Sequence, residues 1–314
     1  HILNQRRLWR DTGFILVFQM RFDADCAPCL MKRVLFQSRL VGNGREFEAV
    51  KSAADVFSAM MDPGMRSVEI ATEVHRRAYE AVGSEDPYYD LKVRADEVAE
   101  PFMTALDDAV KSSDDPLRAA VMAAVVGNIM DFGAGTAISD PDEFMGVFDG
   151  MMAQGLGHDD IDAMRAVLDK VPGVVYIFDN CGESQLDKVL IRQLRRMGKR
   201  VVGVVRGAPI LNDVTMQDAE RIGLDREMDR IVTTGKFYIG VDWNDVPDDM
   251  AEEISRCGFI LAKGMANYEA SSDFDLPVPI AHILRTKCVP VARSLGVGTE
   301  LNVLKIRMPG GGNR

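Results

Sequence analysis

The residues best suited to chemistry are Asp179 and Asn180, which directly follow a short apolar run, Gly173–Phe178. That run is continuous and rich in β-branched and aromatic residues, which predicts a buried strand. In open α/β sheets, ligands bind beyond the carboxyl ends of the strands. A carboxylate and an amide there offer the hard oxygen ligands that suit Mg²⁺ or Mn²⁺. Alone, the pair is equally compatible with a turn that caps the next helix.

A second pair of the same chemistry, Asn212 and Asp213, comes shortly after the next predicted strand, Arg200–Val205. It too could be a simple turn. Two such pairs after successive strands, however, would converge at one edge of a parallel sheet. Two carboxylates and an amide make a Mg²⁺-type site that keeps room for water and a substrate phosphate. The sequence therefore indicates a divalent-metal site at this edge.

Further polar residues follow the predicted strands, and Lys263 is expected to point at the same crevice. Lys263 follows a third predicted strand, Gly258–Ala262, and Asn267 comes shortly after it. A lysine at a strand end is usually a solvated charge, but here its ammonium is expected to neutralise phosphoryl oxygens. Glu183 and Asp187 are four residues apart and share one face of the next predicted helix. Acids at a helix N-terminus are also favoured by the helix dipole alone.

Asn128 and Asp131 lie where an apolar helical stretch, Ala119–Val126, gives way to a glycine-containing segment. Two interpretations are open for this pair. The side chains could satisfy backbone groups at the end of a buried helix. Alternatively, they could contact a substrate from the helical half of the chain.

The sequence contains a single C-x-x-C motif, formed by Cys26 and Cys29. A closed zinc site needs two more ligands, and no matching motif follows. The remaining cysteines, Cys181, Cys257 and Cys288, could complete a site only if the fold brought them near. We expect Cys26 and Cys29 to begin a helix outside the strand-end cluster, as buried or idle thiols. The odd count of five cysteines favours a reducing cytoplasm.

The pattern of apolar residues divides the chain into two parts. From about residue 24 to 150, apolar residues recur at helical spacing, which predicts a helical bundle or cap over residues 20–158. From residue 159 to 314, strands alternate with amphipathic helices, which predicts an α/β domain with a mostly parallel, Rossmann-like sheet. The predicted strands of this part also include Ile231–Thr233, Lys287–Ala292 and Leu301–Ile306. Residues 1–19 lack a clean period and are expected to be a non-native or disordered extension.

Bulk properties narrow the classes of function. The chain has 314 residues and a net charge of −11, which argues against a nucleic-acid-binding surface. No apolar run is long enough to cross a membrane. No P-loop, dinucleotide-binding glycine motif or G-x-S-x-G elbow is present. We expect a cytoplasmic protein that handles a small phosphorylated metabolite, and the sequence gives no basis for predicting its oligomeric state.

Taken together, the motifs resemble those of the DUF89 family, the metal-dependent damage-control phosphatases with an ARMT1-like domain, and most of all its archaeal and bacterial C-x-x-C branch. The resemblance spans Met20 to Met308. It implies a divalent ion (Mn²⁺, Co²⁺, Ni²⁺ or Mg²⁺) held by Asp179, Asn180 and Asp213. It also implies a phosphate ester between the ion and Lys263, with further substrate contacts from Asn128, Asp131, Glu183, Asn212 and Asn267. Cys181 occupies a position where small residues are common in relatives.

These observations predict metal-assisted hydrolysis of small phosphomonoesters, such as sugar phosphates, phosphopantetheine-like compounds or damaged phosphometabolites. Asp179, Asp213 and Lys263 are the predicted catalytic residues. Whether water or a carboxylate is the nucleophile stays open. The alternative is a non-catalytic metal- or nucleotide-binding protein that uses the C-x-x-C motif for metal or partner contact.

Overall fold

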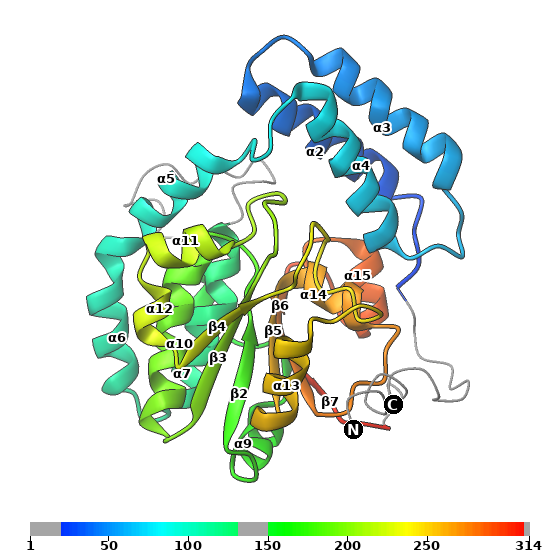
Figure 1. The fold of residues 1–314 in the computed structure, drawn as a ribbon. Coiled ribbons are helices and arrows are strands. Elements are labelled where there is room, and N and C mark those ends of the chain that lie inside the picture. Colours follow the sequence, from blue (N-terminus) through cyan, green and yellow to red (C-terminus); the bar gives the residue numbers. More distant parts are fainter. Residues whose placement is uncertain (1–19, 131–149, 311–314) are drawn as a thin grey trace.

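The computed structural model describes residues 20–130 and 150–310, and within them the strands form one seven-stranded sheet in the order β1-β7-β6-β5-β2-β3-β4 (Figure 1). All neighbouring strands are parallel except β6 and β7. The prediction of an α/β fold with a helical N-terminal region and a mostly parallel sheet is confirmed. The strands are β1 (His158–Asp159), β2 (Gly173–Ile177), β3 (Arg200–Val205), β4 (Arg230–Thr233), β5 (Ile260–Lys263), β6 (Ile280–Arg285) and β7 (Asn302–Arg307).

Helices cover both faces of this sheet and its carboxyl edge. Residues 1–19, including the predicted extension, and Asp131 lie outside the described part of the chain. The longer helices are α2 (Cys26–Val41), α3 (Glu46–Met60), α4 (Ser67–Val82), α5 (Tyr89–Ala99), α6 (Met103–Lys111), α7 (Pro116–Val126), α9 (Ile161–Leu168), α10 (Glu183–Arg196), α13 (Asp248–Cys257) and α14 (Gly264–Ser271). The shorter ones are α11 (Met216–Arg221), α12 (Leu224–Glu227) and α15 (Val289–Leu295).

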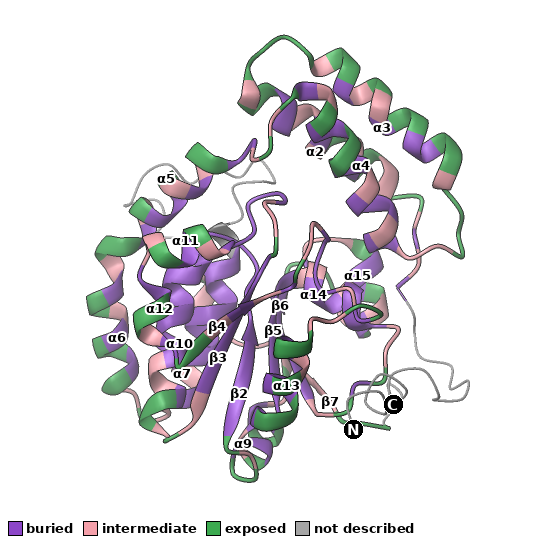
Figure 2. Cartoon of the chain, in the orientation of Figure 1, coloured by how far each residue is buried: buried purple, intermediate pink, exposed green. Residues whose placement is uncertain are grey.

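Alternation along the central strands builds two apolar layers, and β2, β3, β5 and β6 between them are almost wholly buried (Figure 2). Val174 and Tyr176 of β2 face α7 and α10, whereas Val175 and Ile177 face α13. Side chains on a strand point alternately to opposite faces, so a strand buried on both faces must be apolar throughout. This explains why the run after Gly173 is a reliable signal of a central strand.

The helical N-terminal region divides between two packing partners. Helices α2, α3 and α4 form their own apolar cluster, which rests on Leu211 and Ile239 from loops beyond the sheet. Helices α5, α6 and α7 instead pack on α10 and the face of the sheet. A 3₁₀ turn at Glu100–Phe102 separates α5 from α6. Pro101 within that turn lacks the N–H that a continuous α-helix would need.

One predicted strand is wrong. Residues 289–292 belong to helix α15 rather than to a strand, and the strand that pairs with β5 on this side is β6, which the sequence does not predict. Pro290 stands in the first turn of α15, where its fixed φ and missing N–H are tolerated, and Gly296 ends that helix in a left-handed conformation. Strand β6 escaped detection because His282 and Arg285 interrupt its apolar pattern, although both are buried.

No helix in the described ranges, 20–130 and 150–310, is long and apolar enough to cross a membrane. The core of the α2–α4 cluster contains a buried histidine, His75 on α4. Its Nδ1 lies 2.8 Å from Gln37 Oε1 on α2. That amide oxygen only accepts, so Nδ1 carries a proton. Burial, with a smaller contribution from Arg33, lowers the pKa of His75 to about 3.

This low pKa predicts a specific acid sensitivity. The folded pKa of His75 is about 3 and the unfolded value is 6.5, so the unfolded state binds more protons between these limits. Stability is therefore fully present above pH 6.5 and is lost as pH falls through this window, by up to about 1.4 kcal/mol per pH unit. The difference in unfolding free energy between wild type and His75→Gln should shrink as pH falls from 6.5 towards 3 in chemical denaturation. A constant difference would contradict a buried neutral imidazole.

Candidate metal and phosphate site

The loops after β2 and β3 are joined directly by backbone hydrogen bonds. The Val214 N–H donates to the Asp179 carbonyl at 2.9 Å, and the Cys181 N–H donates to the Asn212 carbonyl at 2.8 Å. Asn180 and Asp213 thereby form an antiparallel bridge beyond the ends of two parallel strands. The structure thus brings the two acid–amide pairs of the sequence together at one point of the sheet edge.

A buried arginine that sequence reasoning missed lies against both carboxylates. Arg206, only 1% exposed, donates from Nε to Asp213 Oδ2 at 2.6 Å. Its Nη2 is 3.7 Å from Asp179 Oδ1. The guanidinium offsets the repulsion between two carboxylates that are both nearly buried. Its sequence signal is only its position, directly after a buried strand.

The side-chain amide of Asn180 is held in one orientation. Its Nδ2 donates to Asp179 Oδ2 at 2.9 Å and to Glu183 Oε2 at 3.2 Å. An amide whose nitrogen faces two carboxylates must turn its oxygen, Oδ1, away from them. The site thus presents two carboxylates and one amide oxygen.

Helix α14 begins in van der Waals contact with this cluster. A Cβ on Gly264 would lie 1.8 Å from Asp179 Oδ2, and Gly264 has φ +75°. Only glycine allows both that backbone conformation and that approach. Three residues further along α14, Asn267 donates from Nδ2 to the carbonyls of Phe178 and Lys263. Its Oδ1 is buried and has no hydrogen-bond partner among the described residues.

Lys263 lies beneath the cluster and does not line the cavity described below. Its fully buried ammonium donates to the Ala124 carbonyl at 2.7 Å, to Glu183 Oε1 at 3.1 Å and to Asp187 Oδ1 at 2.6 Å. Burial alone would lower the pKa of Lys263, but the two carboxylates outweigh it and raise the pKa above its ordinary value. All three N–H bonds of the ammonium therefore serve the protein scaffold, and a direct contact of Lys263 with phosphate stays a prediction.

Of the other residues predicted to contact substrate, some line the cavity and others lie behind its wall. Asn128 lines the cavity, and its Nδ2 donates to Glu183 Oε2 at 2.5 Å. Its carbonyl accepts from the Lys287 ammonium at 2.6 Å. Glu183 and Asn212 are buried behind the cavity wall. Lys287, which the sequence predicts in a strand, also lines the cavity.

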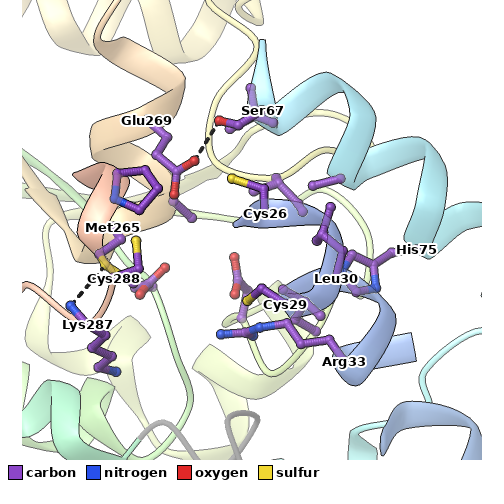
Figure 3. Close-up of a pocket in the computed structure, with 18 of the residues that line it drawn as sticks. Cys26, Cys29, Leu30, Arg33, Ser67, His75, Met265, Glu269, Lys287 and Cys288 are labelled. Carbon is purple, nitrogen blue, oxygen red and sulfur yellow. Dashed lines mark hydrogen bonds between the residues drawn. The ribbon is translucent and has the colours of Figure 1, made fainter. Parts of the chain in front are cut away.

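A cavity of about 170 Å³ opens between the sheet edge and helices α2 and α4, with Asp179, Asn180 and Asp213 in its lining. Figure 3 shows Arg33 and Cys29 of α2 on one side of the cavity and Cys288 on the other, with Lys287 next to Cys288. Apolar side chains, among them Leu30 and Met265, complete much of the wall.

The expectation that the C-x-x-C motif lies outside the strand-end cluster is wrong. Cys26, Cys29 and Cys288 line the same cavity as Asp179. Helix α2 begins at Cys26, and the packing of the α2–α4 cluster over the loops beyond the sheet turns that end towards the cavity. Burial raises the pKa of Cys26 to about 12, whereas Cys29 is exposed. Cys181 lies elsewhere, buried in the core next to α5.

Comparison with known proteins identifies the family. The model of the damage-control phosphatase ARMT1-like domain matches residues 22–303. The chain belongs to this family. It is 34% identical over 289 residues to a damage-control phosphatase of Archaeoglobus fulgidus, covering 91% of this chain and 99% of that protein. An uncharacterised protein of Methanocaldococcus jannaschii is 31% identical, with 91% and 95% covered.

The fold of the ARMT1-like domain is shared with a solved structure. The crystal structure of a DUF89 family protein from Pyrococcus horikoshii superposes with a TM-score of 0.81 at 24% identity, covering 93% of this chain and all of that one. The resemblance drawn from the motifs is therefore confirmed at the level of family. The name of the Archaeoglobus fulgidus relative supports phosphatase chemistry for the family.

The donor set of this ARMT1-like cavity fits a hard divalent cation. No group of three or more His, Cys, Asp or Glu side chains in the described ranges is arranged to hold a metal ion. An ion at Asp179 and Asp213 would thus complete its shell with amide oxygen and water. Mg²⁺ and Mn²⁺ accept such a shell, since they bind through one or two carboxylates and keep several waters. The three cavity thiols, by contrast, form no closed site for a soft metal.

A matched pair of glycine variants tests the contact between α14 and Asp179. Gly264 and Gly198 share φ +75°, but nothing lies within 4 Å of a Cβ on Gly198. Alanine at either position should cost about 1–2 kcal/mol of stability through backbone strain. Only Gly264→Ala should also displace the Asp179 carboxylate and weaken Mn²⁺ binding, measured by titration calorimetry. Equal Mn²⁺ affinities in the two variants would contradict the geometry.

The cavity thiols predict a pattern of alkylation. Iodoacetamide at pH 8 should modify exposed Cys29 before Cys26, by more than about tenfold in rate, because the thiolate is the reactive form and burial disfavours it at Cys26. Mn²⁺ with inorganic phosphate should slow the reaction at Cys29. Peptide mass spectrometry follows both rates. Unchanged modification of Cys29 with phosphate present would place that thiol away from the phosphate position.

Proposed function

We propose that this ARMT1-like protein is a metal-dependent phosphatase that hydrolyses small phosphomonoesters. The observation that carries the proposal is the convergence of Asp179, Asn180 and Asp213 at one end of a cavity. When bound, a divalent ion (Mn²⁺, Co²⁺, Ni²⁺ or Mg²⁺) would polarise the phosphoryl group and activate water. Family membership and the Archaeoglobus fulgidus relative named a damage-control phosphatase support this choice.

The chain's own residues would bind and orient the phosphoryl group. Arg33 and Lys287 both line the cavity, and the guanidinium of Arg33 points into it. Preorganised cations aimed at a transferring phosphoryl group stabilise the charge that develops there. Glu183 and Lys263 would act from behind the wall, because Glu183 accepts from both Asn128 and Asn180 while Lys263 holds it in place.

The shape of the cavity supports a small leaving group. Met265, Ala266 and Glu269 line it along α14, so the cavity follows about one turn of this helix, roughly 6 Å of its axis. At the end of that turn Ser67 donates to Glu269 Oε2 at 2.6 Å, and Figure 3 shows the other carboxylate oxygen turned towards the cavity. This is room for the alcohol part of a sugar phosphate, a phosphopantetheine-like compound or a damaged phosphometabolite.

A non-catalytic role is the competing proposal, and one observation favours it. The C-x-x-C thiols and Cys288 share the cavity with the carboxylates, so the cavity could serve metal or nucleotide binding alone. Turnover separates the two proposals. The metal-free protein should hydrolyse no phosphomonoester, and added Mn²⁺, Co²⁺, Ni²⁺ or Mg²⁺ should restore hydrolysis across a panel of phosphometabolites. Binding without turnover of any compound would favour the non-catalytic role.

Asp213→Asn tests the ligand set with little change in shape. The amide keeps an acceptor for Arg206 Nε, which the wild-type carboxylate binds at 2.6 Å, but it removes the charge that attracts the ion. We expect Mn²⁺ affinity and metal-dependent kcat/KM each to fall by about 10²-fold or more, because a directly bound carboxylate is lost. Thermal unfolding checks that the variant is folded. Wild-type affinity and turnover in a folded variant would remove Asp213 from the site.

A further inference from the structure

Helix α5 contacts both loops that carry the proposed metal ligands. Lys92 and Asp96 are four residues apart on α5, so their side chains share one face of the helix. Both are buried, at 1% and 4% exposure. Each reaches a different loop of the sheet edge, and neither belongs to the lining of the cavity.

Asp96 holds the loop after β2. Its Oδ1 accepts the Gly182 N–H at 2.7 Å, two residues beyond Asn180. Gly182 has φ +84°, and a Cβ there would lie 2.9 Å from the Cβ of Ala95. The loop and α5 are therefore in direct contact, and the carboxylate fixes the backbone just after the Asp179–Asn180 pair.

Lys92 holds the loop after β3. Its ammonium donates to Asp218 Oδ2 at 2.8 Å. The same carboxylate oxygen accepts from the Thr215 N–H at 3.0 Å, completing a capping box at the start of α11. Thr215 comes two residues after Asp213. Lys92 is therefore linked to the second ligand loop through one residue, Asp218.

Arg221 closes the network between the two loops. Its Nη2 donates to Asp96 Oδ2 and its Nη1 to Asp218 Oδ1, both at 2.6 Å. A third acid, Asp86, pairs with Lys92 at 2.6 Å. Two cations and three carboxylates are thus interlocked in a largely buried setting, where removing one member leaves an uncompensated charge. Such a network favours one geometry over its neighbours.

We propose that α5 acts as a clamp, in which Asp96 and Lys92 set the position of the Asp179–Asn180 pair relative to Asp213 and so determine metal affinity. The clamp rests on the proposed metal site. It makes Asp96 and Lys92 positioning residues, which act on the ion through the backbone of the two loops. A role confined to stability would instead leave the metal affinity of the folded protein unchanged.

The test measures Mn²⁺ dissociation constants by titration calorimetry, without substrate, alongside thermal unfolding. Asp96→Ala removes the acceptor for Gly182 and should weaken Mn²⁺ binding about tenfold, the lower end of the effect of residues that orient metal ligands. Asp96→Asn keeps an acceptor for the Gly182 N–H and should recover part of that loss. If Asp96→Ala does not fold, Arg221→Gln is measured in its place, with a smaller loss expected.

Glu253→Gln is the matched control. Glu253 is also fully buried and ion-paired, with Arg200 and Arg230, but it belongs to α13 on the opposite face of the sheet. It should lower thermal stability while leaving the Mn²⁺ dissociation constant unchanged. Equal Mn²⁺ affinities in wild type, the folded clamp variants and Glu253→Gln would overturn the clamp alone. A wild-type protein that binds no Mn²⁺ would overturn the proposed metal site and the clamp with it.

Discussion

The site depends on the pairing of two short backbone segments beyond the ends of β2 and β3. Hydrogen bonds from Val214 to Asp179 and from Cys181 to Asn212 bring two carboxylates together in a nearly buried place. Two neighbouring carboxylates repel each other, and burial further disfavours the charged form of each. The positive charge of Arg206 offsets this repulsion, and the start of α14 packs directly against Asp179. The positions of the cavity, the proposed ion and the α5 clamp all depend on this pairing of the two backbone segments.

The meeting of these residues at the sheet edge could be predicted because it follows from local pattern. A run apolar on both faces predicts a central parallel strand, and neighbouring parallel strands end at the same edge. Asp179, Asn180 and Asp213 therefore meet as the sequence indicates. Local pattern failed at residues 287–292, where β-branched residues around Pro290 resemble a strand but form the first turn of α15.

What the sequence could not predict are contacts between segments distant in the chain. Nothing in the spacing of Cys26 and Cys29 tells where α2 begins relative to the sheet, and the helix turns out to begin at the cavity wall. Lys263 was expected to face the substrate, yet the structure surrounds its ammonium with Glu183, Asp187 and a backbone carbonyl. Arg206 and the α5 network depend on the same kind of tertiary contact, which leaves no local signature.

Anomalous diffraction from crystals grown with Mn²⁺ tests the central claim most directly. The account predicts one strong peak at the sheet edge, about 2.0–2.6 Å from oxygens of Asp179, Asn180 and Asp213, with water in the remaining positions. A peak on the sulfurs of Cys26, Cys29 or Cys288, or no peak at the sheet edge at saturating Mn²⁺, would contradict it.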